Sequence, residues 1–174
     1  MLRVLGALLL ALVIAAGTLG VVRFWPPTPL PEGIKADKVL VLKGEQRLVL
    51  LSGGAPIKSY PVALGWSPKG PKTRQGDGKT PEGTYKVDYR NAASGFYRAL
   101  HVSYPNGQDR AKARKLGVSP GGAIMIHGIK NGFGWVGPLH RFVNWTDGCI
   151  AVTDEEIREI WSAVPDGTPI EIRP

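Results

Sequence analysis

Short runs of apolar residues, many of them β-branched or aromatic, alternate with Gly, Pro and Asn along most of the chain after residue 36. The runs at 39–42 and 47–51 flank Lys43-Gly44-Glu45-Gln46, and this arrangement predicts a β-hairpin. Further strands are expected in similar runs, at 57–64, 83–89, 97–104 and 123–126. The pattern predicts a mainly β domain.

Two segments carry a helical pattern instead, at 109–116 and 153–164. The second begins with Thr153 followed three residues later by Glu156, which is a capping box, and its apolar residues recur on one face. A Pro-Asp-Gly turn ends it, and 168–172 is expected to be a final strand. Many short strands with one or two short helices predict a twisted β-sandwich or an open barrel.

The N-terminal segment has a different pattern, because no charged side chain occurs from residue 4 to residue 22. As a helix, this run is long enough to cross a hydrocarbon core of about 30 Å. Residues 1–25 are therefore expected to be a membrane anchor or a cleaved signal peptide, and the aromatic pair Phe24-Trp25 favours the anchor. Either way the rest of the chain is expected in the cell envelope, on the periplasmic or extracytoplasmic face, anchored or secreted.

Residues 26–35 are rich in proline, which predicts a stiff, extended spacer. Residues 36–174 then form one domain, long enough to bury a core without disulfide bonds. The net charge of +8 is most simply a solvated basic surface that aids solubility. If it served binding outside the cytoplasm, it would favour anionic lipid or cell-wall polymers, and nucleic acid is an unexpected partner there.

Cys149 is the single cysteine of the chain, and it follows Gly148 at the end of a loop. A lone thiol in an exported chain has no disulfide partner, which makes it a candidate nucleophile. The alternative is a buried, inert thiol that precedes an apolar strand.

A nucleophilic thiol needs a base within hydrogen-bond reach, and three histidines are available. His127 is the strongest candidate because it ends an apolar strand and is followed at once by Gly128, where the chain must turn. His101 lies within an alternating strand, where a structural role is expected, and His140 lies in a loop beside Arg141. Zinc would use the same residue types, but the sequence has no CxxC, HxxxH or HExxH spacing, so we expect neither metal nor cofactor.

Together these motifs resemble the catalytic domain of the L,D-transpeptidases (YkuD type). The resemblance covers residues 38–173 and rests on three short motifs, Thr80-Pro81-Glu82-Gly83, His127-Gly128 and Thr146-Asp147-Gly148-Cys149. It implies that residues 36–174 are a catalytic domain with the fold of that family. Two positions depart from the family pattern: Asp147 replaces its second histidine before Gly-Cys, and Ala151 replaces its frequent arginine.

The resemblance implies a cysteine-dependent L,D-transpeptidase that acts on peptidoglycan stem peptides through a thioester acyl-enzyme. Cys149 would attack, His127 would be base and later acid, and a backbone N–H of Gly148 or Cys149 would hold the oxyanion. Substrate contacts are expected around these motifs, from Gly128, Trp135, Trp145, Thr146 and Asp147. Two alternatives stay open, a hydrolase that uses the same acyl-enzyme (an L,D-carboxypeptidase or an amidase) and a non-catalytic wall-binding domain.

The segment 128–146 combines several glycines with Phe and Trp residues, which predicts a lid or substrate loop. We expect a backbone carbonyl or Asn131 to orient the His127 imidazole.

Asp147 is expected to accept backbone N–H bonds in the turn before Gly148, as Asp often does. In a second interpretation its carboxylate faces the site and raises the pKa of Cys149, unless Arg141 or Lys130 pairs with it.

Overall fold

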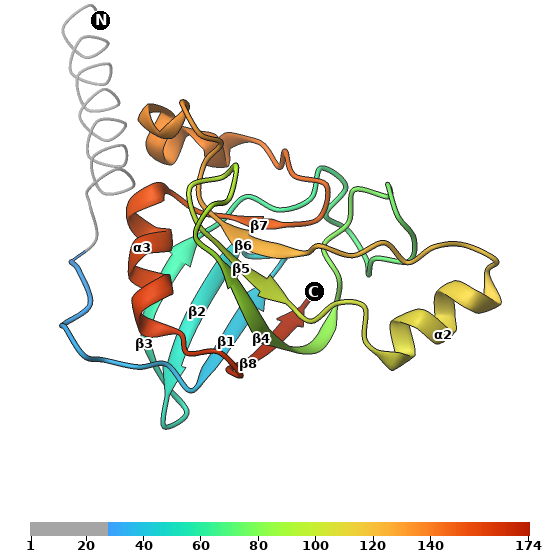
Figure 1. The fold of residues 1–174 in the computed structure, drawn as a ribbon, viewed down its shortest axis with the longest axis horizontal. Coiled ribbons are helices and arrows are strands. Elements are labelled where there is room, and N and C mark those ends of the chain that lie inside the picture. Colours follow the sequence, from blue (N-terminus) through green and yellow to red (C-terminus); the bar gives the residue numbers. More distant parts are fainter. Residues whose placement is uncertain (1–27) are drawn as a thin grey trace, which may run out of the picture.

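The computed structural model describes residues 28–174, so the predicted anchor or signal peptide lies outside the described residues. This part of the chain forms strands, two α-helices and one 3-10 helix (Figure 1). In chain order the elements are β1 Lys38–Leu42, β2 Arg47–Ser52, β3 Ala55–Pro61, β4 Gly83–Asn91, β5 Ala99–Val102, α2 Gly107–Lys115, β6 Met125–His127, η1 Gly134–Phe142, β7 Ile150–Ala151, α3 Asp154–Ala163 and β8 Pro169–Arg173. No helix within residues 28–174 is long and apolar enough to span a membrane.

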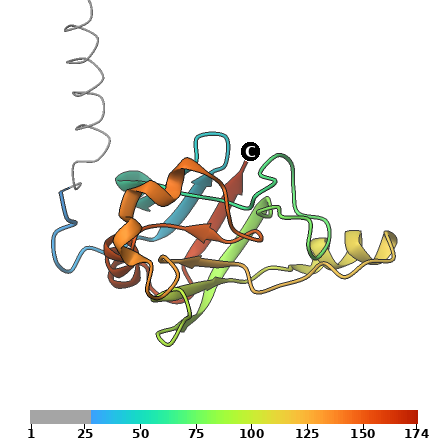
Figure 2. The same ribbon diagram turned by 90° about the horizontal axis from the view of Figure 1, so that it is seen from above.

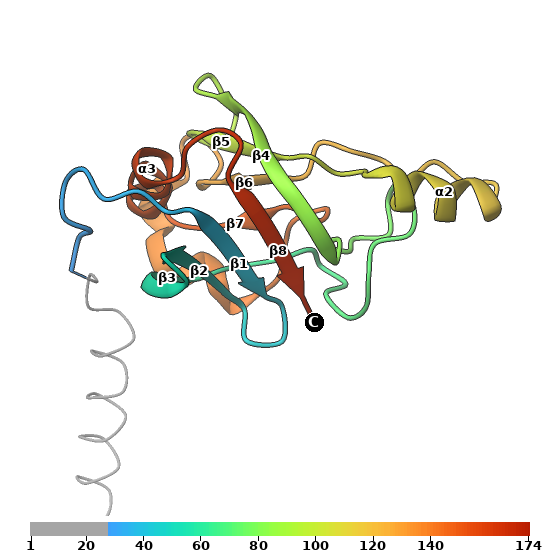
Figure 3. The same cartoon turned by 90° about the horizontal axis from the view of Figure 1, so that it is seen from below.

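The strands form one eight-stranded sheet in the order β3-β2-β1-β8-β4-β5-β6-β7. The pairs β1–β8 and β6–β7 are parallel, and the others are antiparallel. Figure 3 shows the central strands β1, β8 and β4 side by side. The sheet curls so far that the segment after β3 bridges to the opposite edge, with Ala63 opposite Ala151 and Gly65 opposite Thr146. The predicted mainly β, open-barrel fold is therefore confirmed.

The core fills the inside of this curled sheet with aliphatic side chains from most of its strands. Helix α3 adds Ile157, Ile160 and Ala163 to the core, and its predicted capping box is present, with Thr153 and Glu156 each bonded to the other's backbone N–H. Helix α2 buries Ala113 alone and projects from the opposite end of the molecule from η1 (Figure 2). The core therefore depends on the sheet and α3.

Element η1 was not predicted, and β7 was expected only as an apolar strand of unstated length after Cys149. Strand β7 contains just two residues, too few to show a period in the sequence. Segment η1 is a 3-10 helix interrupted at Gly137, whose φ is 50°, and contains Pro138, so it lacks the 3.6-residue repeat of an α-helix. Segment η1 lies between the His127-Gly128 and Thr146–Cys149 motifs, and β7 directly follows the second of them.

The described part of the proline-rich spacer lies against the domain. Leu30 packs against the core, and its N–H donates to the Glu159 carboxylate of α3. The Lys58 ammonium also bonds to Glu159, and it donates to the Thr28 carbonyl at 2.8 Å. Lys35 bonds to the Ser162 carbonyl at the other end of α3. Residues 28–35 are therefore docked along this helix.

Candidate active site

Strands β6 and β7 bring the two predicted motifs together. In their parallel pairing, Ile126 is opposite Ile150 and His127 is opposite Ala151. Ile126 and Ile150 point into the core, and side chains alternate along a strand. Cys149 lies directly before Ile150, so its side chain is on the same face of the sheet as His127. The topology thus places the candidate nucleophile and the candidate base on one face of the sheet, on neighbouring strands.

The Cys149 thiol is half-buried, and it donates to the Ala123 carbonyl at 3.5 Å. Burial raises the pKa of this thiol, a backbone hydrogen bond from Met125 lowers it, the Asp147 charge raises it and the Lys72 charge lowers it. The net direction is upward, so the resting group is a neutral thiol. Attack therefore requires a base that removes the proton during the reaction.

The turn that presents Cys149 is held by Thr146. Its buried hydroxyl accepts from the Gly148 N–H at 3.2 Å and donates to the Cys149 carbonyl at 2.7 Å. Its backbone pairs with Leu64 and Trp66 across the sheet closure. The Thr146 hydroxyl, expected to contact substrate, and the Gly148 N–H, one of the two expected oxyanion donors, are thus hydrogen-bonded within the turn.

Gly148 is required in this turn by its conformation and by the space around it. Its φ is 127°, and a β-carbon would lie 2.5 Å from the Lys79 carbonyl oxygen. No L-residue with a side chain fits here without moving the loop that packs against Gly148.

Gly148→Ala is expected to destabilise the protein by about 2–4 kcal/mol, because it combines backbone strain with a steric clash. Gly167→Ala is the matched control, since Gly167 has a φ of 89° but no atom within 4 Å of the β-carbon position. The control should lose about 1 kcal/mol from strain alone. Urea unfolding measures both, and equal losses would show that the contact with Lys79 is unimportant.

The His127 imidazole is buried and oriented by a backbone carbonyl. Its Nδ1 lies 2.6 Å from the Gly128 oxygen, which can act solely as an acceptor, so Nδ1 carries the hydrogen. Nε2 is then the nitrogen with a free lone pair. Burial lowers the pKa of His127, and the bond to Gly128 raises it by less, so the ring is neutral at neutral pH. Asn131, the other expected orienting group, instead accepts from the Tyr97 N–H and donates to the Ser94 carbonyl.

Asp154, the first residue of α3, fixes the chain just after His127. Its carboxylate accepts from the Ile129 N–H at 2.8 Å, and a β-carbon at Gly128 would lie 2.6 Å from that carboxylate. Gly128 is therefore needed for this close approach. Sequence reasoning missed Asp154, although its position directly after the N-cap Thr153 is where helices favour a carboxylate.

Two aromatic rings pack against the His127 imidazole. The Phe96 ring centroid lies 4.6 Å from that of His127, and the Trp145 centroid lies 5.8 Å from it in an edge-to-face arrangement. The Trp145 indole N–H donates to His140 Nδ1 at 3.4 Å. Trp145 therefore contacts both His127 and His140, and the substrate contact expected of it stays a prediction.

The motif around Thr80 anchors the loop that approaches Gly148. The Thr80 hydroxyl accepts from the Gly65 N–H at 3.2 Å, and Glu82 pairs with buried Lys43 at 2.8 Å. Nearby, Lys72 and Asp77 form a buried ion pair at 2.8 Å. Burial by itself would raise the pKa of Asp77, but the bond from Lys72 and three backbone N–H bonds lower it to about 2. These residues fix the loop that packs against Gly148.

Asp147 does not take the turn role that we expected, because Thr146 supplies the side-chain acceptor there. Asp147 is exposed, and its carboxylate has no hydrogen bond or ion pair within residues 28–174. Arg141, considered as its partner, pairs with Glu156 instead. The carboxylate acts on the site through its charge, which raises the pKa of Cys149.

Asp147→Asn is expected to lower the pKa of Cys149, because it removes a negative charge that favours the neutral thiol. The pH profile of iodoacetamide alkylation should therefore move to lower pH, with stability little changed. Asp166→Asn, at an exposed position beside Arg90, is the matched control and should leave the profile in place. An unmoved or raised profile for Asp147→Asn would contradict the electrostatic role.

The predicted lid segment presents apolar surface to solvent. The large exposed side chains here are Phe133, Trp135, Leu139, Phe142 and Val143, with Trp135 81 % exposed. His140 points inward and is buried. The substrate contact expected of Trp135 stays a prediction.

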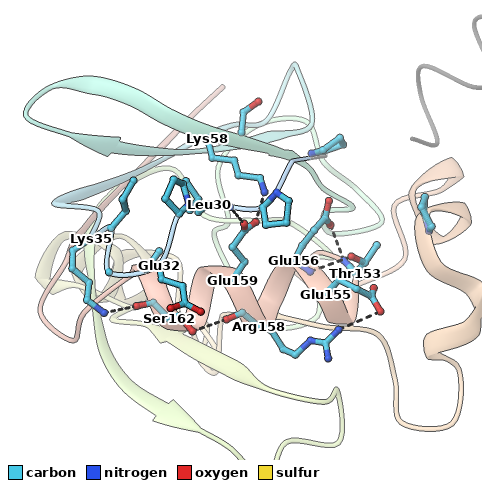
Figure 4. Close-up of a pocket in the computed structure, with 18 of the residues that line it drawn as sticks. Leu30, Glu32, Lys35, Lys58, Thr153, Glu155, Glu156, Arg158, Glu159 and Ser162 are labelled. Atoms are coloured by element: carbon cyan, nitrogen blue, oxygen red, sulfur yellow. Dashed lines mark hydrogen bonds and ion pairs between the residues drawn. The ribbon is translucent and has the colours of Figure 1, made fainter. Parts of the chain in front are cut away.

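A separate cavity of about 860 Å³ lies between residues 29–35, β3, η1 and α3 (Figure 4). Neither Cys149 nor His127 lines it, so it is distinct from the candidate active site. Within residues 28–174, no cluster of His, Cys, Asp and Glu is suited to hold a metal ion.

Comparison with known proteins gives a family match over the whole of this domain. The model of the L,D-transpeptidase catalytic domain (YkuD) matches residues 36–172. YafK of Escherichia coli (strain K12), itself provisionally assigned as an L,D-transpeptidase, is 33 % identical over 110 residues, or 62 % of this chain. Those residues are 37 % of YafK, so the chain spans little more than a third of that relative.

Solved structures share the fold. Bd1075 of Bdellovibrio bacteriovorus is 27 % identical with a TM-score of 0.56, over 82 % of this chain and 49 % of that one. The helical cell shape determining protein Pgp2 of Campylobacter jejuni is 24 % identical with a TM-score of 0.58, over 78 % and 46 %. An L,D-transpeptidase of Xylanimonas cellulosilytica is 16 % identical with a TM-score of 0.51, over 83 % and 64 %.

Proposed function

We propose that this chain, which belongs to the L,D-transpeptidase family through residues 36–172, is an acyltransferase that uses Cys149 as its nucleophile. The observation that carries the proposal is the pairing of β6 with β7, which sets Cys149 and His127 on one face of the sheet. The imidazole is fixed at Nδ1 by the Gly128 carbonyl, so Nε2 is available to the thiol.

In the first step, Cys149 Sγ attacks the carbonyl carbon of the third residue of a tetrapeptide stem, and the thiol proton passes to His127 Nε2. The carbonyl oxygen becomes an oxyanion. Because the Gly148 N–H is bonded to Thr146, we assign the Cys149 N–H as the oxyanion donor from this turn. The C–N bond then breaks, His127 returns the proton to the leaving amine of D-alanine, and a thioester remains.

In the second step, the amine of another stem attacks the thioester carbon. His127 Nε2 takes the proton of that amine, the C–S bond breaks, and the proton returns to Cys149 Sγ. The neutral state of both side chains supports this scheme, because burial raises the pKa of the thiol and lowers that of the imidazole. The proton therefore moves during the attack, with no resting thiolate–imidazolium pair.

The hydrolytic alternative follows the same first step with water as the acceptor, which releases a tripeptide. The sequence match to the family and the site geometry support the common thioester, and the acceptor is a separate question. The proposed site of action is the cell envelope, with residues 1–25 as anchor or signal peptide and stem peptides as partners.

Mass spectrometry of the purified protein with tetrapeptide stems tests the proposal. We expect an acyl-enzyme with the mass of the tripeptide attached to Cys149, free D-alanine and a cross-linked dimer. Tripeptide without dimer would support the hydrolase, and the absence of both products and of any adduct would support a non-catalytic wall-binding domain.

A further inference from the structure

Most of the net charge of this chain comes from two segments. Residues 69–79 and 109–115 hold eight Lys or Arg side chains and two Asp side chains, which is +6 of the net +8. Both Asp side chains are engaged, because Asp77 pairs with buried Lys72 at 2.8 Å and Asp109 caps the start of α2. The other seven basic side chains form no ion pair in the described part of the chain: Lys69, Arg74, Lys79, Arg110, Lys112, Arg114 and Lys115.

The fold brings the two segments to one end of the molecule. The Gln75 N–H donates to the Ser119 carbonyl at 2.8 Å, and a β-carbon at Gly121 would lie 3.2 Å from the Gln75 Cα. The loop before β4 therefore packs on the segment that follows α2, and Figures 1 and 3 show loop and helix together, at the far end from α3. We call residues 69–79 and 109–115 the basic arm.

The charges on α2 are exposed and lie close to one another. The helix buries Ala113 alone, and its four basic side chains face solvent. Arg110 and Arg114 are four residues apart, and Lys112 and Lys115 are three apart, spacings at which like charges destabilise a helix. The helix dipole favours cations in the last turn, but it does not account for the three unpaired cations of the loop. The concentration of charge therefore indicates a surface for an anionic partner.

The basic arm adjoins the candidate nucleophile. The Cys149 thiol donates to the carbonyl of Ala123, in the segment 116–124 that leads from α2 to β6. From the loop of the arm, the Lys79 carbonyl oxygen lies 2.5 Å from the position that a β-carbon of Gly148 would take. Both parts of the arm thus lead to the turn that presents the thiol, and a polymer bound on the arm would be held beside Cys149.

We propose that the basic arm binds the carboxylates of peptidoglycan stem peptides, outside the stem that enters the site, and so docks this chain on its polymeric substrate. The inference rests on the proposed function, since it takes peptidoglycan as the substrate. Seven cations spread over a loop and a projecting helix match a long polymer with repeated carboxylates, whereas a single small anion would contact few of them.

A lipid bilayer fits the basic arm less well. Helix α2 has no apolar face to insert, because Ala113 packs inward and Leu116 at the C-cap is its one large exposed apolar side chain. Residues 28–35 are docked along α3, so the chain enters the domain at the opposite end from α2 (Figure 2). A membrane anchor before Thr28 would leave the arm on the far side of the domain from the bilayer.

Cosedimentation of the full chain with purified peptidoglycan sacculi, in neutral detergent, tests the inference without turnover. The helix variant carries Lys112→Gln, Arg114→Gln and Lys115→Gln, which keep good helix formers on α2. We expect its Kd for sacculi to rise about 10-fold at low salt, because each exposed ion pair is worth about two- to three-fold. The difference from the parent should disappear in about 0.5 M NaCl. A loop variant, Lys69→Gln with Arg74→Gln, leaves α2 unchanged and should raise Kd about 5-fold.

The matched control removes the same charge elsewhere, at exposed positions that pair with carboxylates: Arg47→Gln, Arg158→Gln and Arg173→Gln. It should bind sacculi as the parent does. Turnover of a free tetrapeptide stem should be unchanged in the helix variant, because a short peptide in the site does not reach α2. Binding that depends on the arm would support the inference even if the parent turned over no stem peptide, so a failure of the proposed function is read separately.

Three results would overturn the inference. Equal weakening in the helix variant and in the control would reduce the effect to net charge. Full binding of the parent to sacculi whose carboxylates have been converted to neutral amides with a carbodiimide and ethanolamine would exclude those carboxylates as the ligand. Unchanged sacculus binding by the helix and loop variants would exclude the wall polymer, and their weaker retention on micelles that contain phosphatidylglycerol would identify a lipid headgroup instead.

Discussion

Cys149→Ala is expected to abolish turnover of stem peptides while leaving the fold intact. The thiol is the one side chain of the site able to form the thioester, and removal of a nucleophile typically costs about 10⁴-fold or more in kcat. Because the thiol is half-buried and its one side-chain bond is to the Ala123 carbonyl, the substitution should cost little stability. Product formation by mass spectrometry and thermal unfolding measure the two effects.

Cys149→Ser is the companion variant for this prediction. It keeps a donor for Ala123, but its hydroxyl is a far weaker nucleophile than a thiol when a single neutral imidazole is the base. We expect a folded protein with activity close to background. Activity within ten-fold of the parent in either variant would eliminate Cys149 as the nucleophile.

His127→Gln is expected to lower kcat/KM by about 10²- to 10⁴-fold, the usual contribution of a positioned general base. Gln approximates the size of the imidazole and can bond to the Gly128 carbonyl, but it cannot take a proton from the thiol. Because burial lowers the pKa of His127, the parent should keep its base form well into the acid range. The acid limb of its kcat/KM profile should therefore lie below pH 6.5, the ordinary pKa of a histidine, and be absent in the variant.

His101→Gln is the control for general histidine effects. His101 bonds to the Asp88 carboxylate on the surface of β5 and is outside the site, so its loss should leave kcat/KM unchanged. A parent profile with its acid limb above pH 7 would contradict the environment described for His127. Unchanged activity of His127→Gln would require a different base.

Local patterns were enough to predict most of the scaffold. The hairpin of β1 and β2 follows from apolar runs around a polar turn, and the start of α3 follows from Thr153 and Glu156, whose bonds are made within four residues. These features depend on neighbours in the sequence, which is why they are visible without a structure. The strand predicted at 57–64 shows the limit of local patterns. Strand β3 ends at Pro61, and the chain then turns away so that Ala63 bridges to Ala151.

Part of the candidate site also follows from local patterns, and part of it does not. The sequence indicated Cys149 because it is a lone thiol that follows Gly at the end of a loop. It indicated His127 because this histidine ends a strand directly before Gly, where the chain turns. It also indicated a turn at Gly148, but it assigned the side-chain acceptor there to Asp147, whereas Thr146 makes that bond. Both residues are frequent turn formers, and the choice depends on which side chain is buried by the sheet closure.

By itself, then, the sequence determined the mainly β class and the capped helix, and it singled out the candidate nucleophile and the candidate base, because each follows from residue type and short-range spacing. The tertiary structure alone decided how these parts meet: the parallel pairing of β6 and β7, the contact of Asp154 with Gly128, and the burial of His140 behind Trp145. These contacts join residues whose proximity is set by the curl of the whole sheet, and no local pattern encodes that curl.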